Sequence, residues 1–406
     1  MTSLSAREAP VVPLTASPER PPAPVEPVDI VRCAVFSSAG YGLAPLADAL
    51  AGGAVGARDT AAPAPPGDWP PAPGTSPVAG FAPEGVLGRK GLSRLTRTDQ
   101  LASVACTLAL DEPAVRSAGI GPGDTGIVLG TSVGSTRRVG EFIRDTFVEE
   151  RPYFVNPSHF PGVLMNSAAG RAAIRLGLTG VNATVSGGPL AGLNALRYAR
   201  NTLLAGHARR LLTGAFEELS PQRAWAWHRT RGLVAGARLG EGGAVFVLEA
   251  PRTGRPASDV PGEGPAPLAR LLACEVGFAD PDRGLTGVSE RLAACLRTAL
   301  ERSGLTAGDV AVAAPGACGR RGWAAVEERA LRQVFSRLPA GEQPHRLEVQ
   351  PVLGETDGAA FALQLAALLA RWQHGGPHTR RERAAVLTSV GPDGNVGCAV
   401  VVRPPE

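Results

Sequence analysis

Residues 182–196 carry the clearest chemical pattern in the chain, Asn-Ala-Thr-Val-Ser-Gly-Gly-Pro-Leu-Ala-Gly-Leu-Asn-Ala-Leu. This order predicts a short strand, a glycine turn and a helix that begins at Pro189, because glycine permits positive φ and proline suits the first helical position. Such a strand–turn–helix elbow holds a nucleophile where the N–H groups at the start of the helix can stabilise an anion. We therefore expect the functional site to lie at this elbow.

Two side chains could act as the nucleophile. Ser186 lies in the elbow, although a turn serine more often bonds its own backbone. Cys318 follows a strand-like run, where a small residue is more often buried than reactive. His159, His207 and His228 could be general bases, but none lies in a motif with a partner, which favours positions at the surface or at helix ends. The sequence leaves open whether Ser186 or Cys318 has a substitute catalytic role.

Strand-like and helix-like runs alternate along the chain around this elbow. The strand-like runs are residues 30–36, 126–130, 183–185, 210–214, 244–249, 268–277, 310–314, 347–349, 385–389 and 397–402. This alternation, in two comparable halves, predicts an α/β fold with helices layered on sheets. We predict a disordered Pro-rich leader over residues 1–28, an N-terminal half over 29–250, a linker over 251–267 and a C-terminal half over 268–406.

Composition excludes several classes of function. The chain has 406 residues, 44% hydrophobic and 19% charged, which is typical of a soluble globular protein with a large core. Its net charge of +4 comes from scattered arginines, with Lys90 as the one lysine, so nucleic-acid binding is not indicated. The six cysteines lie far apart without disulfide or metal spacing, which favours a reducing cytoplasm without metal or cofactor. No apolar run approaches a membrane span.

The order of several motifs resembles that of the β-ketoacyl synthases of the thiolase fold. The similar segments are Asn-Pro-Ser-His-Phe-Pro at 156–161, Met-Asn-Ser-Ala-Ala-Gly at 165–170, Leu-Gly-Glu-Gly-Gly-Ala at 239–244 and Gly-Pro-Asp-Gly-Asn at 391–395. With the elbow, the resemblance covers about residues 29–403. It implies an α/β, thiolase-like fold, in which two pseudo-repeated α/β halves form a layered αβαβα core.

The catalytic residues of that family are absent at the matching positions. The family's elbow cysteine falls on Pro189, or on Gly188 with a shift of one residue. Its first catalytic histidine falls on Pro315, its lysine on Gln350 and its second histidine on Glu355. A carboxylate at Glu355 would repel the malonyl carboxylate that must bind there. The resemblance therefore implies a degenerate member without catalytic residues of its own.

Two further departures from the family concern the surroundings of the site. The stretch between residues 217 and 239 is shorter than in the family, and its Trp225 and Trp227 could be either a partner contact or loop packing. Glu327 and Glu328 resemble a family glutamate, but without a lysine at position 350 we expect both to be solvated helix residues.

The resemblance also implies a partner. In type II polyketide systems a catalytic ketosynthase pairs with a homologous inactive subunit, the chain length factor, and the interface holds the tunnel for the growing chain. We expect such a heterodimer here, served by an acyl carrier protein, with Ala183, Thr184 and Val185 at the dimer interface. The alternatives are a stand-alone ketosynthase-like acyltransferase or cyclase with a re-invented site, and a structural homodimer that scaffolds carrier proteins. The sequence does not indicate the product or its chain length.

The resemblance implies that the helix expected over residues 137–149 lines the tunnel. Four side chains share one of its faces and are the gate candidates: Phe142, Thr146, Glu149 and Val139. Ile143 and Phe147 fall on the adjacent face and are expected in the core. Phe142 could also be a core residue instead of a gate.

Overall fold

The structure is a computed structural model that describes residues 26–52, 68–116, 119–250 and 266–404. The predicted leader and linker lie largely outside these residues, although strand β1 begins at Val28, the last residue assigned to the leader. The strands are β1 (Val28–Ser37), β2 (Gly40–Tyr41), β3 (Gly74–Ser76), β4 (Thr125–Thr131), β5 (Asn182–Ser186), β6 (Arg210–Glu217), β7 (Arg238–Gly240), β8 (Gly242–Glu249), β9 (Ala269–Phe278), β10 (Val310–Ala314), β11 (His345–Arg346), β12 (Ala384–Val390) and β13 (Asn395–Val402).

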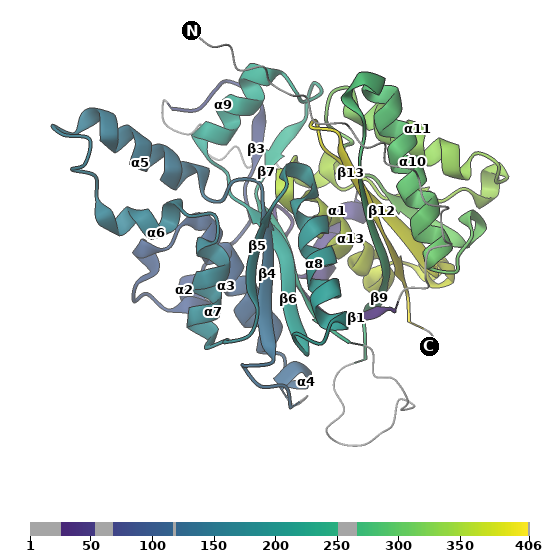
Figure 1. Ribbon diagram of the computed structural model, residues 1–406, viewed down its shortest axis with the longest axis horizontal. Helices are drawn as coiled ribbons and strands as arrows, with labels where there is room; N and C mark the ends of the chain where they lie inside the picture. The colour runs from purple at the N-terminus through teal and green to yellow at the C-terminus, as the bar shows by residue number, and fades with distance from the viewer. Residues whose placement is uncertain (1–25, 53–67, 117–118, 251–265, 405–406) are drawn as a thin grey trace, which may run out of the picture.

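Helices flank these strands on every face (Figure 1). They are α1 (Leu43–Ala51), α2 (Glu84–Leu87), α3 (Arg97–Leu110), α4 (Pro113–Arg116), α5 (Thr136–Val148), α6 (Phe160–Val163), α7 (Ser167–Leu176), α8 (Ala191–Leu204), α9 (Pro221–Thr230), α10 (Gly284–Arg302), α11 (Trp323–Phe335), α12 (Gln350–Leu353) and α13 (Ala360–His374). Two short 3-10 turns border the site, η4 (Gly188–Leu190) and η8 (Asp357–Ala359). None of the helices in the described residues is long and apolar enough to cross a membrane.

The sheet repeats one strand order twice. Its path is β11-β10-β12-β13-β9-β1-β8-β6-β4-β5, with β2 paired to β1. From the outer edge inward, β5-β4-β6-β8-β1 and β11-β10-β12-β13-β9 have the same pattern, with parallel pairs outside and antiparallel pairs inside. The two runs meet where the start of β1 pairs with β9. This repeat confirms the two pseudo-repeated α/β halves expected from the sequence.

Three apolar clusters stack the helices and strands into five layers. The central cluster places α8 and α13 between the two runs of strands. A second cluster packs α3 and α7 on the outer face of the first run, and a third packs α10 and α11 on the outer face of the second. Helix α13 is apolar on all sides and almost wholly buried, as expected for a helix in a central layer. The layers thus follow the order α, β, α, β, α.

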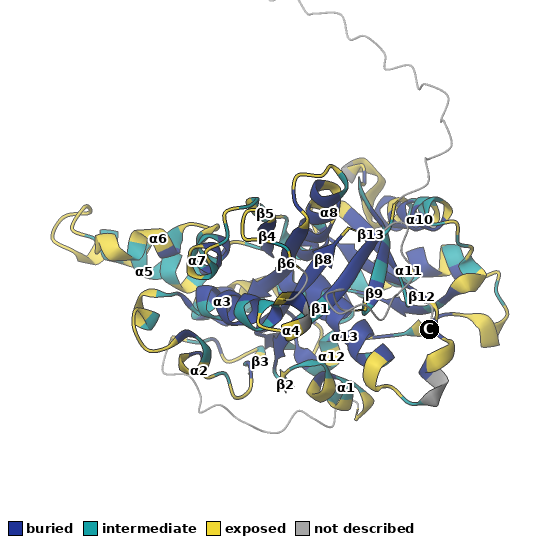
Figure 2. Ribbon diagram, turned by 90° about the horizontal axis from the view of Figure 1, so that it is seen from below, coloured by how far each residue is buried: buried dark blue, intermediate teal, exposed yellow. Residues whose placement is uncertain are grey.

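Helices α5 and α6 extend from the body as an arm, defined here as residues 133–165 (Figures 1 and 2). None of the 13 residues of α5, all of them described, is buried. Ile143 is 51% exposed and Phe147 82% exposed, so the prediction that both lie in the core was wrong. Their helical spacing is typical of a core-facing side, but no layer of the described residues covers that side of α5. Glu149 caps the end of α5 and is exposed.

Candidate functional site

The elbow has the predicted order of elements and no nucleophile at its turn. Strand β5 ends at Ser186, and the turn continues through Gly187 and Gly188, the latter with φ of 52°, into η4 and then α8. Pro189 lies in η4, and its carbonyl oxygen accepts a hydrogen bond of 3.0 Å from the Ser389 hydroxyl. Helix α8 can start directly above β4 because Gly130 has no side chain: a Cβ there would come within 2.5 Å of the Ala191 carbonyl oxygen.

The two alternative nucleophiles are bonded to backbone acceptors. The Ser186 hydroxyl donates to the Ser132 carbonyl oxygen at 2.8 Å. It therefore bonds a neighbouring loop, whereas a bond to its own backbone was expected. The Cys318 thiol donates to the Pro315 carbonyl oxygen at 3.5 Å. Burial raises the pKa of Cys318, and the charges of Glu327 and Glu348 raise it further, so the thiol stays protonated. Neither group is set up as a nucleophile.

Glu355, at the position of the second histidine, lies in a buried ion pair. Its side chain is fully buried and receives Arg320 Nη2 on Oε1 at 2.5 Å and Arg320 Nε on Oε2 at 2.8 Å. Gln350, at the position of the lysine, donates its amide to Oε2 at 2.6 Å. Burial opposes the charge of Arg320, but Glu355 outweighs it and raises the pKa of Arg320. The carboxylate that was expected to repel a malonyl group is thus paired with Arg320, which neutralises its charge.

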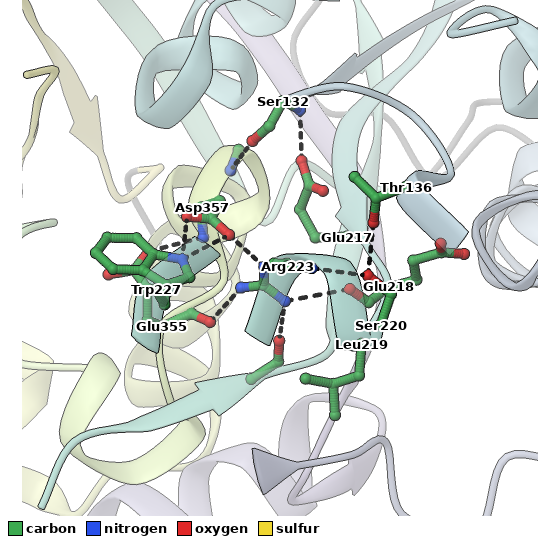
Figure 3. A network of polar contacts seen from close by, with 12 residues as sticks. Ser132, Thr136, Glu217, Glu218, Leu219, Ser220, Arg223, Trp227, Glu355 and Asp357 are labelled. Atoms are coloured by element: carbon green, nitrogen blue, oxygen red, sulfur yellow. Dashed lines mark hydrogen bonds and ion pairs between the residues drawn. The ribbon is translucent and has the colours of Figure 1, made fainter. Parts of the chain in front are cut away.

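A second ion pair lies beside the first (Figure 3). Arg223 Nε donates to Asp357, and Arg223 Nη2 donates to the backbone carbonyl of Glu355 at 2.5 Å. The Trp227 indole N–H donates to Asp357 Oδ1 at 3.1 Å, while its ring lies under the Arg320 guanidinium at 5.9 Å. Burial alone would raise the pKa of Asp357, but the charges of Arg223 and Arg320 outweigh it and hold that pKa below its usual value. Trp227 is thus part of the internal network.

These groups lie beside the elbow. Turn η8, which begins at Asp357, packs against elbow turn η4, and Arg320 Nη1 lies 3.5 Å from the carbonyl oxygen of Val390 in the strand next to the elbow.

A cavity of only about 10 Å³ lies below β5, lined by Thr98, Leu129, Gly130, Thr131, Met165, Ala168, Thr184 and Phe216. This volume can hold at most about one water molecule. An open cleft of about 880 Å³ lies on the other side of Trp227.

Further buried carboxylates lie at the end of β6 and within α11. Glu217 and Glu218 are 3% and 1% exposed and hold the loop that leads into α5. Burial and the nearby Asp357 charge raise the pKa of Glu217 to about 7. Glu327 is fully buried and accepts the N–H groups of Gly316 and Ala317 at 3.0 and 2.8 Å, so the expectation of a solvated side chain was wrong. Its carboxylate fixes the turn that follows β10.

The sequence reading missed these charged residues, although a signal was present. Arg320 is one of the arginines that looked scattered along the sequence, and Arg223 lies in the shortened stretch after β6. Each arginine pairs with an acidic residue, Glu355 or Asp357, in the segment that resembles the family's lysine–histidine motif. Basic residues in two segments and acidic residues in a third could have indicated this pairing.

The predicted gate and interface residues lie on the arm and at the sheet edge. Ala183, Thr184 and Val185 are half-buried in β5, the last strand of the sheet. The gate candidates that lie within α5 are all half-buried: Phe142, Thr146 and Val139. The ring of Phe142 lies 6.3 Å from that of Phe160 in α6. Whether these residues line a tunnel or an interface stays a prediction.

Comparison with known proteins gives first the class and then the family. A β-ketoacyl synthase structure from Burkholderia phymatum STM815 covers 94% of this chain with a TM-score of 0.76 at 18% identity, which shows a thiolase-like ketosynthase fold. The structure of the ishigamide ketosynthase/chain length factor is 31% identical, covers 94% of this chain and is covered completely, with a TM-score of 0.76. Residues 84–252 match the family described as "Beta-ketoacyl synthase, N-terminal domain". The chain therefore belongs to the β-ketoacyl synthase family.

Curated relatives are more distant. The 3-oxoacyl-[acyl-carrier-protein] synthase 2 of Vibrio cholerae is 24% identical over 193 residues, which are 42% of this chain and 46% of that protein. Erythronolide synthase EryA3 of Saccharopolyspora erythraea is 28% identical over 236 residues, 53% of this chain and 7% of that protein. The chain thus matches less than half the length of these curated relatives.

Proposed function

We propose that this chain is a non-catalytic, chain-length-factor-like subunit that pairs with a catalytic ketosynthase in a type II polyketide synthase. The chain shapes the tunnel for the growing acyl chain, and the partner performs the chemistry on substrates delivered by an acyl carrier protein. The 31% identity to a ketosynthase/chain length factor over 94% of the chain supports this role. A cytoplasmic location is part of the same proposal.

The Arg320–Glu355 ion pair is the observation that carries the proposal. An active ketosynthase needs a histidine at the position of Glu355, free to meet the substrate. Here both carboxylate oxygens are taken up by Arg320 and Gln350, and the side chain is fully buried. Removing either partner alone would leave an unpaired buried charge, which is costly. The geometry therefore favours a closed, structural site over a catalytic one.

The open edge of β5 supports a homologous partner. Ile127 donates its backbone N–H to the carbonyl of Val181, and β4 and β5 are parallel and in register from there. Backbone groups alternate along a strand, so those of Ala183 face β4 and those of Thr184 face the open edge. Proteins rarely leave such an edge uncovered. A second chain of the same fold can pair its own β5 across this edge around a two-fold axis.

Exposed apolar side chains on the arm point to the same kind of partner. They are Val133, Ile143, Phe147, Val148, Tyr153, Phe154, Phe160, Leu164 and Met165. On either side of β5, Ile174 of α7 is 80% exposed and Tyr198 of α8 is 45% exposed. Apolar surface of this extent is typical of a protein–protein interface. In this proposal, the partner that covers this surface also completes the tunnel.

Co-expression with an intact Cys-His-His ketosynthase tests the proposal. We expect a 1:1 complex on size-exclusion chromatography with mass measurement, and acylation of the ketosynthase subunit alone when acyl carrier protein is added. The Pro189→Cys variant should gain no condensing activity, because Pro315 and Glu355 still replace the histidines.

Two results would reject this function. One is a monodisperse monomer that ignores the ketosynthase. The other is an acyl adduct on Ser186 or Cys318 of this chain, found by mass spectrometry, which would instead support the stand-alone acyltransferase or cyclase.

A further inference from the structure

Residues 131–137 lead from β4 into the arm and are called its root here; most of their polar contacts are to one turn. This turn, residues 217–220, joins β6 to α9 (Figure 3). Helix α5 itself has no buried residue, and it packs mainly on α6 and α9. Because apolar packing does not fix the helix, its direction depends on what holds its first turn.

Glu218 is the main acceptor at this root. Its Oε1 receives the Ser135 hydroxyl at 2.9 Å and the backbone N–H of Arg137 at 3.0 Å. Its Oε2 receives the Thr98 hydroxyl of α3 at 3.2 Å. Ser135 is the N-cap of α5, and Arg137 lies in its first turn. One buried carboxylate therefore ties the start of α5 to α3 in the body of the protein.

Two further contacts join the same turn to the arm. The hydroxyls of Ser220 and Thr136 lie 2.7 Å apart. Glu217 Oε1 accepts the backbone N–H of Ser132 at 2.5 Å. The Ser132 hydroxyl in turn accepts the N–H of Gly358 in η8 at 3.0 Å, so the root also touches the second half of the chain.

We propose that Glu218 and the Thr136–Ser220 pair are positioning residues that set the direction of α5. Buried polar groups with fully matched partners favour one orientation over others. This placement stands on the contacts alone. It rests on the proposed function for one consequence: because α5 carries Phe142, a change in its direction alters the depth of the tunnel and hence product length.

Hydrogen exchange on the purified full-length chain tests the placement. Thr136→Val keeps the side-chain volume and removes the hydroxyl, and Thr136→Ser keeps the hydroxyl as the matched control. Glu218→Gln keeps one acceptor oxygen and removes the charge. We expect the amides of residues 138–148 to exchange roughly five- to tenfold faster in Thr136→Val and Glu218→Gln than in the wild type. The amides of α8 in these variants, and those of α5 in Thr136→Ser, should exchange at the wild-type rate.

Unchanged exchange in α5 would overturn the proposal, and so would an equal acceleration in α5 and α8, which indicates general destabilisation. Product length from the reconstituted complex is the second measurement. A broader distribution for Thr136→Val, restored by Thr136→Ser, supports the positioning role and its consequence together. Faster exchange in α5 with unchanged product lengths supports the positioning role and counts against the proposed gate function.

Discussion

At the residue scale, two buried ion pairs lie beside the elbow. They are Arg320–Glu355 and Arg223–Asp357, and of these four residues only Glu355 falls where the resemblance places a catalytic histidine. A buried pair gives little net stability, because desolvation offsets the attraction, yet the loss of one partner is costly. Once both partners of a pair are present, substitution of one of them alone is therefore strongly disfavoured.

A double-mutant cycle on the first pair measures this dependence. Arg320→Met leaves Glu355 without its partner in a fully buried position. We expect Arg320→Met to lower the free energy of unfolding by about 3–5 kcal/mol. Arg320→Met combined with Glu355→Leu should recover most of that loss, measured by urea denaturation. The two residues would not be coupled if the double variant lost as much free energy of unfolding as the two single variants together.

Glu217 gives the protein a pH-dependent stability. Its pKa is about 7 in the folded chain against an ordinary value of 4.5, so between these values the folded state holds a proton that the unfolded state has released. Stability from this group is therefore present below pH 4.5 and declines as pH rises to about 7. Glu217→Gln should raise the free energy of unfolding by about 3 kcal/mol at pH 8 and change it little near pH 4.5.

Thermal or urea unfolding of Glu217→Gln at the two pH values checks this sign. Glu149→Gln is the matched control. Because Glu149 is exposed, this variant should leave the free energy of unfolding unchanged at both pH values. A Gln variant that is less stable than the wild type at pH 8 would show that ionised Glu217 contributes favourably through Arg223 and Ser132.

At the element scale, β5 and α5 are incomplete in the isolated chain. Among the residues that the structure describes, β5 pairs with a strand on one edge only, and α5 exposes apolar side chains along its outer side. Both features favour association, because unpaired backbone groups at a strand edge and exposed apolar side chains lower the free energy when a partner covers them.

Proline substitution distinguishes the two edges of β5. Thr184→Pro removes an N–H that faces the open edge, so the chain should fold with a nearly unchanged melting temperature and lose at least tenfold in affinity for the ketosynthase. Ala183→Pro removes an N–H on the side of β4 and should instead destabilise the fold itself. Isothermal titration beside thermal melts reads both effects. Normal complex formation by Thr184→Pro would place the interface elsewhere.

Phe142 is the sharpest gate candidate on α5. It is half-buried against Phe160, so Phe142→Ala should cost less than the roughly 3–5 kcal/mol of a core phenylalanine. Products from the reconstituted complex should lengthen by one or two extension units, with Phe142→Leu in between. Unchanged products from a complex with a sharply lowered melting temperature would identify Phe142 as a core residue.

At the scale of the whole molecule, five layers enclose the core while one end remains exposed. The helices α8 and α13 are covered by strands on both sides, whereas the arm extends beyond the layers (Figure 2). A protein built in this way has a folded body and a surface that favours association.

We accordingly expect the chain on its own to self-associate through the arm. Phe147→Glu places a charge on a side chain that is 82% exposed, and it should reduce both self-association and ketosynthase binding without lowering the melting temperature. Leu285→Glu is the control, because Leu285 is 52% exposed on α10 in the opposite outer layer. Analytical ultracentrifugation reads the result. Equal effects of both variants would mean that association is unspecific.

The sequence by itself determined most of the elements, although the strand expected over 347–349 is found at His345–Arg346. The helix expected over residues 137–149 is Thr136–Val148, and the strand expected over 244–249 is Gly242–Glu249. The elbow was found from its glycines and Pro189. These features depend on neighbours along the chain, through helical and strand periodicity and turn chemistry, and local patterns are therefore sufficient to predict them.

Tertiary structure alone decided which charges meet and which apolar faces stay exposed. Arg223 and Asp357 are 134 residues apart, and Arg320 and Glu355 are 35 apart, on different elements of the layered fold. The apolar spacing of Ile143 and Phe147 resembles that of a core helix, because periodicity shows that a face is apolar but not what covers it. Burial and pairing depend on long-range packing, which brings these elements together only in the folded chain.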